Sequence, residues 1–335
     1  MDVPRLLLAA VVCLAFTGPA ALAQDDEEIV AQSARVKGPI KPWKQVRGFG
    51  RVLDLRTLPV VIDEPGLYAI DRNWQLSQSA VSVYPEPIKI TADNVTLDLH
   101  SYEISTHVNA PPLSTLLVIS GHGVEVRNGS LSACCDGASA VRSTTGAWLH
   151  HLSLASSAPM EFEGRGARLT DSEINTVVAV SFAGNSVVRR NTMSCRVGCV
   201  AVLGDGTQVI DNKLFPSQGG GIEIVGNNNI LANNIADVSS APDVSEVFEI
   251  KGDSNVVRDN IVLLGGMVRT LFAISGAANT LEGNIAGPPT EGLRGGVGIR
   301  FATDGNYYGN NRMATTVPFE LGGTVQEDWG GNVAY

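Results

Sequence analysis

The sequence predicts an all-β protein, a single-stranded parallel β-helix of about ten coils with terminal caps. A nine-residue phrase, SNVVRDNIV at 254–262, recurs in altered form along the chain, and a short phrase of alternating apolar residues precedes each copy. A repeat this small cannot bury its own apolar face and must stack on its neighbours. The apolar residues that close the copies follow one another at intervals of 19 to 28 residues: Leu131, Leu154, Ile174, Met193, Leu214, Ile235, Ile261, Ile285 and Met313.

Each period begins with a strand, for which residues 248–252 (FEIKG) are the clearest copy. Phe248 and Ile250 alternate with Glu249 and Lys251, which is the two-residue periodicity of a strand with one buried face. A turn rich in Gly, Asn and Asp follows. The recurring phrase then supplies a second strand, marked by paired valines such as Val256 and Val257, and a longer, variable loop ends the period. Helical periodicity is nearly absent. Two short strands per period, wound in one direction, therefore predict a parallel β-helix rather than a leucine-rich repeat or a propeller.

Asparagines recur at one place in five successive periods. Stacked coils lie about 4.8 Å apart, and side-chain amides at that spacing can hydrogen-bond to one another in a ladder. The sequence therefore predicts a structural ladder, not a binding site, formed by Asn191, Asn212, Asn234, Asn260 and Asn284.

The two ends of the chain lack the repeat. Residues 1–23 combine Arg5, an apolar run over 6–16 and the sequence Ala-Leu-Ala at 21–23, which predicts a secretory signal peptide. That run is too short to span a membrane. We expect residues 24–51 to form a polar N-terminal segment or cap, 52–313 the β-helix and 314–335 a C-terminal cap, because a solenoid needs protected ends. The mature protein is predicted to be secreted or periplasmic and not membrane-spanning.

The net charge indicates which partners the protein can bind, and the cysteine positions indicate which disulfide bonds it can form. The net charge is −10 and aromatic residues make up 6% of the chain, so a nucleic-acid partner is disfavoured. Cys134 and Cys195 are expected about three coils, or roughly 14 Å, apart, which is too far for a disulfide. An exported chain permits a local Cys195–Cys199 bridge, and the state of Cys134 and Cys135 stays open. Neither cysteine pair has the spacing of a zinc site.

Three segments, at 65–70, 88–99 and 123–129, together resemble the opening of many bacterial right-handed parallel β-helix repeat proteins of the pectate-lyase-like superfamily. The resemblance covers roughly residues 58–313 and implies the fold. The superfamily includes polysaccharide lyases, glycoside hydrolases, epimerases and phage tailspikes, so the resemblance implies a polysaccharide as partner. The signature motifs of mannuronan epimerases, polygalacturonases and pectate lyases do not occur here, so no single reaction is implied.

The strand periodicity points one column of side chains outward, and in it Glu223 and Glu249 lie on adjacent coils. Their stems are expected about 5 Å apart. Two carboxyl groups so close are what an acid/base or acid/nucleophile pair requires, and the spacing is nominally that of a retaining glycosidase. We predict Glu223, Glu249 and Lys251 as catalytic residues, with Lys251 or an arginine as the base if the reaction is an elimination. Small neighbours in the same column should leave the face flat: Ala179, Ala201, Ala273 and Gly298.

The longest insertions span 236–245, 263–270 and 286–296. Long loops on a rigid scaffold often build sites, and we expect these to wall a groove beside the carboxylate pair. They would bring in Arg269 and Arg294, which with Arg300 are the predicted substrate-binding residues, since cations neutralise a uronic acid carboxylate. No cofactor is predicted, unless Glu223 and Glu249 hold a Ca²⁺ ion.

The same residues also have a purely structural explanation. An outward column in a soluble protein must hold polar residues, and a glutamate beside Lys251 can be a solvated ion pair that contributes little. His150 and its neighbour lack a metal-ligand partner at useful spacing, which is typical of surface or edge histidines. A second polar column mixes charges like an exposed ladder: His151, Asp171, Arg190, Asp211 and Asp259.

Two functions therefore compete. The first is an exported carbohydrate-active protein, a lyase or a glycoside hydrolase that acts on a polysaccharide. The alternative is a non-catalytic β-helix that binds glycan or builds an envelope or surface assembly. A phage-like adhesin would need a trimerising segment, and no heptad pattern is visible. The identity of the glycan, the reaction and the oligomeric state remain open.

Overall fold

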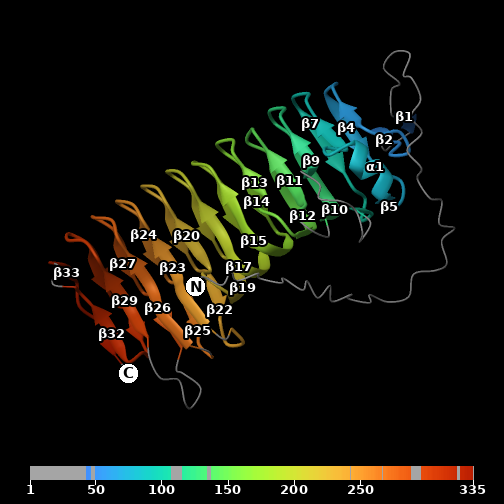
Figure 1. Cartoon of the computed structure of the whole chain (residues 1–335). Helices are drawn as coiled ribbons and strands as arrows, with labels where there is room; N and C mark the ends of the chain where they lie inside the picture. The colour runs from blue at the N-terminus through green and yellow to red at the C-terminus, as the bar shows by residue number, and fades with distance from the viewer. Residues whose placement is uncertain are drawn as a thin grey trace, which may run out of the picture.

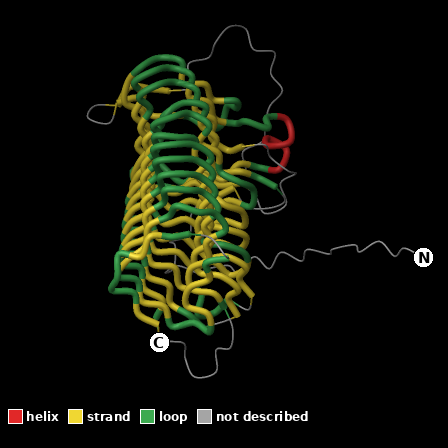
Figure 2. Tube along the Cα trace, turned by 90° about the vertical axis from the view of Figure 1, so that its left-hand side faces the viewer, coloured by secondary structure: helices red, strands yellow, loops and turns green. Residues whose placement is uncertain are grey.

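The protein is a long stack of β-coils (Figure 1). The computed structural model describes residues 43–46, 50–106, 115–133, 137–241, 243–265, 267–287, 296–322 and 325–334. Within these ranges the elements are strands, apart from one short helix, α1 (Gln78–Val83). The strands stack in parallel along the length of the molecule (Figure 2). The predicted all-β parallel β-helix is confirmed.

Each coil has three strand segments, one more than the sequence predicted, and in some coils two segments join into one long strand such as β10 (Glu125–Ala133). The recurring phrase holds two of them, β24 (Val256–Arg258) and β25 (Ile261–Leu263), which are separated by a corner at Asp259 and Asn260. Asp259 has a φ of 55°, and this left-handed conformation turns the chain within two residues. A corner this short does not interrupt the apolar pattern, which is why the two strands read as one in the sequence.

The strands form three faces, named here in chain order within a coil. The first face contains β3 (Val60–Ile62), β6 (Ile88–Ile90), β9 (Thr115–Ile119), β11 (Ser139–Ser143), β13 (Glu161–Phe162), the ends of β15 (Glu173–Phe182) and β17 (Thr192–Val202), β20 (Ile222–Ile224), β23 (Asp243–Ile250), β26 (Met267–Ile274), β29 (Val297–Phe301) and β32 (Val317–Glu320). The second contains β2 (Gly50–Leu53), β4 (Gly66–Ala69), β7 (Val95–Asp98), the starts of β10 (Glu125–Ala133) and β12 (Trp148–Ser156), β14 (Arg168–Thr170), β16 (Val187–Arg189), β18 (Gln208–Ile210), β21 (Ile230–Ala232), β24, β27 (Thr280–Glu282), β30 (Tyr307–Gly309) and β33 (Glu327–Asp328). The third contains β5 (Trp74–Leu76), β8 (Glu103–Thr106), the remaining parts of β10, β12, β15 and β17, β19 (Lys213–Gln218), β22 (Ile235–Asp237), β25, β28 (Ile285–Ala286), β31 (Arg312–Met313) and β34 (Val333–Ala334).

The core is a column of apolar side chains that point inward from all three faces. Phe248 and Ile250 are fully buried, whereas Glu249 between them is partly exposed, as the strand periodicity predicted. Aromatic rings stack between coils, with ring centroids 5.0 Å apart for Phe248 and Phe272. Like residues therefore pack on like residues along the axis, at the spacing set by the strand ladder.

The predicted asparagine ladder is confirmed. The Nδ2 atom of Asn260 donates to Asn284 Oδ1 at 3.0 Å and to the backbone carbonyl of Leu231 at 3.1 Å, and its side chain is fully buried. A second ladder, which the sequence reasoning missed, follows the first face, where Asn255 donates to Asn279 Oδ1 at 3.1 Å. These amides satisfy buried backbone groups at both turns, so they belong to the scaffold.

The two ends of the solenoid are built differently. At the N-terminal end β1 (Trp43–Val46) pairs antiparallel with β2, whereas β2 and β4 pair in parallel. At the other end, residues 314–322 and 325–334 continue the coil, since β32, β33 and β34 pair in parallel with β29, β30 and β31. No helix in the part of the chain that the structure describes is long and apolar enough to cross a membrane.

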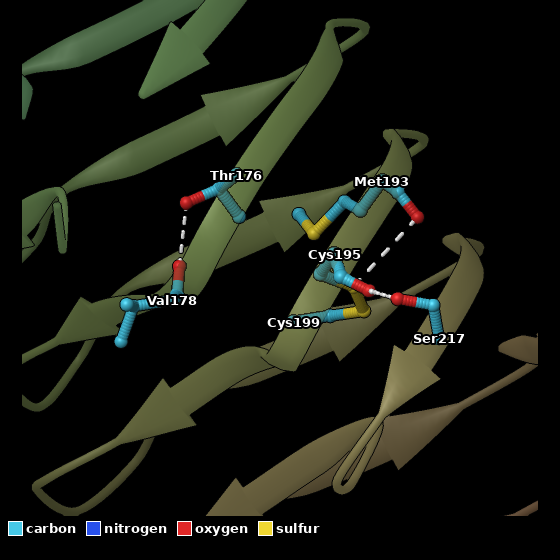
Figure 3. The surroundings of a disulfide bond; sticks show 6 residues. All are labelled: Thr176, Val178, Met193, Cys195, Cys199 and Ser217. Atoms are coloured by element: carbon cyan, nitrogen blue, oxygen red, sulfur yellow. Dashed lines mark hydrogen bonds between the residues drawn. A yellow bond between two sulfur atoms is a disulfide. The ribbon is translucent and has the colours of Figure 1, made fainter. Parts of the chain in front are cut away.

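A disulfide joins Cys195 to Cys199 within β17, so the local bridge that the sequence permitted is confirmed (Figure 3). Their Cα atoms lie 5.3 Å apart. Both residues are buried, and the Ser217 hydroxyl donates to the Cys195 carbonyl at 3.4 Å. The predicted signal peptide, Cys134, Cys135 and Arg294 lie outside the described residues.

Candidate functional site

The strand-face cluster, defined as Glu223, Glu249 and Lys251, lies on the outside of the first face. β20 pairs in register with β23, so Glu223 and Glu249 are directly opposite each other. Lys251 follows β23, and its Nζ lies 2.8 Å from Glu223 Oε1 and 3.0 Å from Glu249 Oε1. The three side chains are between 34% and 42% exposed. The structure thus brings the three predicted catalytic residues together as one solvent-accessible ion-paired group.

Lys251 changes what the two carboxylates can do. Its hydrogen bonds, that to Glu223 first and that to Glu249 second, raise the pKa of Lys251 above its ordinary value. An ammonium between two carboxylates offsets the repulsion that would otherwise favour a shared proton. A lysine held in its charged form is also a poor base for an elimination. This arrangement offers a ligand both acceptors and a donor, and proton transfer by a glutamate would require its bond to Lys251 to break.

The strand-face cluster does not fit Ca²⁺. Calcium takes six to eight oxygen ligands, whereas Glu223 and Glu249 share one cation that the chain itself supplies, Lys251. Among the described residues, no group of three or more His, Cys, Asp or Glu side chains could hold a metal ion.

Arg300 lies in the same outward column as the two glutamates, whereas the sequence reasoning placed it in the next column. Ala273 pairs with Glu249 on one side and with Arg300 on the other, so two strand spacings, about 9.6 Å, separate Arg300 from Glu249. Gly298 was predicted to occupy this position in the outward column. The loop before β29 varies in length, so the sequence does not show how β29 is aligned with β26. Arg300 is already ion-paired, with Nη2 3.2 Å from Glu246 Oε1.

The predicted loop walls are largely strand in the part of the chain that the structure describes. β23 begins at Asp243 and β26 at Met267, and the two pair in register from these residues onward. The insertions at 236–245 and 263–270 therefore widen the first face instead of enclosing a groove. Arg269 is exposed on β26, four residues before Ala273, which places it about 13 Å along the strand from the outward column.

A second site, which the sequence reasoning did not predict, is an open hollow of about 900 Å³ at the corner between the second and third faces. We call it the corner hollow. Four successive coils line it with mostly polar side chains: Asp98, His100, Ser101, Asn128, Gly129, Ser130, His151, Leu152, Ser153, Asp171 and Glu173.

A chain of hydrogen bonds, the corner network, runs from the second face to this hollow. Glu125 Oε1 lies 2.8 Å from His150 Nε2, and His150 Nδ1 lies 2.7 Å from His151 Nδ1. Arg127 donates to Glu125 at 2.9 Å and to Asp98 at 2.8 Å. The His150 side chain is only 10% exposed. The corner network consists of these five residues, and His151 is its member at the hollow that is open to solvent.

The carboxyl groups at the corner are held in their charged form. Burial acts to raise the pKa of Asp98 and of Glu125, but hydrogen bonds from neighbouring donors outweigh it and lower both. A hydrogen bond from Arg190 lowers the pKa of Asp171. These three side chains are therefore carboxylates at neutral pH, and Asp98 and Asp171 are ion-paired with Arg127 and Arg190.

Strand register is the signal that could have revealed the corner network. Glu125 and Arg127 are two residues apart on β10, and Trp148 and His150 are two residues apart on β12, so each pair points to the same side. The pairing of Glu125 with Trp148 and of Arg127 with His150 stacks the pairs on adjacent coils. His150 was predicted to be an ordinary surface or edge residue, because its contacts depend on the register between β12 and β10.

Comparison with known proteins yields no identification, since no family model, no curated protein and no solved structure matches this chain.

Proposed function

We propose that this chain is an exported β-helix protein of the pectate-lyase-like kind that acts on a polysaccharide, which lies along the outer side of the first face. One observation carries the proposal: Glu223, Lys251 and Glu249 form an in-register charged group on an open strand face. Carboxylates and an ammonium provide acceptors and donors for sugar hydroxyl groups.

The surroundings of the cluster support an extended ligand. Ala201 and Ala273 occupy the same column on the coils immediately before and after the two glutamates, so the face is low on either side. Arg300 lies one coil beyond Ala273 and adds a guanidinium that is ion-paired with Glu246. A chain molecule that lies across these coils would meet polar groups at a spacing of about 4.8 Å.

The second candidate is a non-catalytic glycan-binding or surface-assembly protein. The position of Lys251 favours it, because a cation bonded to both carboxylates suits recognition better than proton transfer.

The test measures retention and turnover together on a panel of neutral and anionic polysaccharides, with and without Ca²⁺. For the enzyme, we expect unsaturated products or new reducing ends, and their loss in Glu249→Gln. For the non-catalytic protein, we expect glycan retention without product, again weakened in Glu249→Gln.

Glu161→Gln is the matched control, since Glu161 stands in the same outward column three coils from Glu223. If neither retention nor product appears with any glycan, or if both variants behave alike, the strand face is not the site.

A further inference from the structure

The corner network fixes which ring nitrogens carry protons. Glu125 is a carboxylate and can only accept, so His150 donates from Nε2. In a neutral His150 the other nitrogen, Nδ1, is then an acceptor. The 2.7 Å contact between the two Nδ1 atoms requires that His151 donate from its Nδ1. His151 Nε2 is thereby left with a free lone pair, the form in which an imidazole acts as a base.

The same contacts stabilise the pair after it takes up a proton. A proton that arrives at His151 Nε2 allows the shared proton to move across the 2.7 Å contact to His150. The positive charge then rests on the buried ring, 2.8 Å from the Glu125 carboxylate. In hydrolytic triads a carboxylate orients the basic histidine directly and stabilises its charged form, whereas here the partly buried Glu125 acts through a second imidazole, that of His150.

Two further contacts fix the position of the pair. The Trp148 ring stacks on His150, with centroids 4.3 Å apart, and donates from Nε1 to Thr170 Oγ1 at 3.3 Å. His151 has a φ of 54°, at the corner where the coils before and after carry Asn128 and Asp171 in the same conformation. The solenoid corner therefore turns the backbone sharply at His151, beside a rigidly held partner and at the edge of the hollow.

We propose that the corner hollow is a second, catalytic site that hydrolyses an uncharged acyl ester of a saccharide, with His151 as its general base. Glu125 and His150 act as positioning residues behind it. Seryl hydroxyls of the lining, among them Ser130 and Ser153, can bond to sugar hydroxyls or to the ester oxygen.

In the reaction, His151 Nε2 takes a proton from a water molecule while the water oxygen forms a bond to the ester carbonyl carbon. The carbonyl electron pair moves onto oxygen and then returns as the carbon–oxygen bond to the sugar breaks. The departing sugar oxygen receives the proton from His151, which restores the base. One water is consumed, and the products are a carboxylic acid and a free hydroxyl group.

The side chains that line the corner hollow favour ester hydrolysis over cleavage of a glycosidic bond. Cleavage of a glycosidic bond needs a carboxyl group that is still protonated near neutral pH, whereas Asp98 and Asp171 are bonded to cationic or amide donors that keep them ionised. Asp98 and Asp171 are neutralised by Arg127 and Arg190, so an anionic substrate would meet the Glu173 carboxylate of the lining without gaining a cationic partner. An uncharged ester is the substrate that needs neither an acidic carboxyl group nor a cationic pocket.

The test uses the full chain with p-nitrophenyl acetate and an acetylated neutral glycan, and measures nitrophenol and acetate release. We expect His151→Gln to lower kcat/KM about 100-fold or more, in the range usual for loss of a general base. His122→Gln is the matched control, because His122 is an exposed histidine that contacts Asp93 on another turn. The His122→Gln variant should keep full activity, which would show that ester release does not come from the general reactivity of exposed histidines.

The positioning role has its own readout in the pH–rate profile. In Glu125→Gln the imidazolium loses its carboxylate partner, so the acid limb should move to lower pH while the rate at the plateau falls about 10-fold. Other titratable groups at His151, namely Asp98, His100, Asp171 and Glu173, are unchanged in that variant. A purely structural role would lower the rate without moving the limb.

The charge of the substrate gives a third comparison. p-Nitrophenyl hemisuccinate, which carries a carboxylate, should react at least 10-fold more slowly than the acetate ester. Absence of turnover above the His151→Gln level, equal losses in His122→Gln, or an unmoved acid limb in Glu125→Gln would each overturn the proposal. Failure of polysaccharide retention on the first face would not, because ester release at the hollow is measured independently of the strand-face cluster.

Discussion

The strand-face cluster and the corner network are both groups of charged side chains on the outside of one solenoid, but water reaches them to different degrees. The strand-face side chains are 34% to 42% exposed, whereas those of His150 and Asp98 are 10% and 11% exposed. Exposed pairs are screened and rearrange freely. Buried pairs fix tautomers and charge states. The same repeating scaffold therefore carries a solvent-exposed charged group at one place and a less exposed hydrogen-bond network at another.

The largest difference between the two regions should appear in stability. Glu125→Ala leaves the buried His150 N–H without its acceptor, and we expect the free energy of unfolding to fall by about 2 kcal/mol. Glu249→Ala should cost at most about 0.5 kcal/mol, because its partner Lys251 stays hydrated and keeps Glu223. Urea titration of both variants measures the two costs. Equal costs would mean that burial at the corner does not distinguish the two regions.

The two regions should also lose their contributions at opposite ends of the pH scale. The pKa of Asp98 and of Glu125 is lowered in the folded state, so their contribution is fully present above the unfolded values of about 4 and disappears as pH falls further. The pKa of Lys251 is raised, so its contribution is present below about 10.4 and disappears as pH rises beyond that.

Unfolding followed from pH 3 to pH 11 tests this assignment. Glu125→Gln should flatten the acid limb of the stability profile and leave the alkaline limb unchanged. Lys251→Met should flatten the alkaline limb. A change in the alkaline limb of Glu125→Gln would show that its charge acts over the whole molecule rather than within its own cluster.

The scaffold was predicted well because each coil repeats the same alternation of apolar and polar residues and the same asparagine positions. Alternation placed Phe248 and Ile250 inside and Glu249 outside, and the Asn260 column formed the expected ladder. The prediction failed where the repeat changes length. A variable loop hid the true register of Arg300, and strand β26 begins within a segment that was expected to be a loop.

The corner network was not predicted because its members occur once. The sequence pattern predicts the positions of residues that recur from coil to coil, and it contains no signal for residues that do not recur. Glu125, Trp148 and His150 have no copies in neighbouring coils, so they look like irregularities in the column. Their contacts depend on side-chain directions across two coils, which only the register of β10 and β12 reveals. Unique residues on a repeating scaffold are thus a better guide to a site than the residues that define the repeat.

Salt should give the smallest effect and the sharpest contrast between the two regions. Lys251→Met removes two exposed ion pairs, so we expect a loss of about 0.5 kcal/mol at low ionic strength that vanishes in 1 M NaCl. Arg127→Met removes a guanidinium that bridges Asp98 and Glu125, and its cost should persist in high salt, because the carboxylates that lose their partner are largely buried. Urea titrations of both variants at low and high salt measure the difference. A cost of Arg127→Met that salt abolishes would place the corner network in bulk-like solvent, and the preorganised base inferred from it would lose its physical basis.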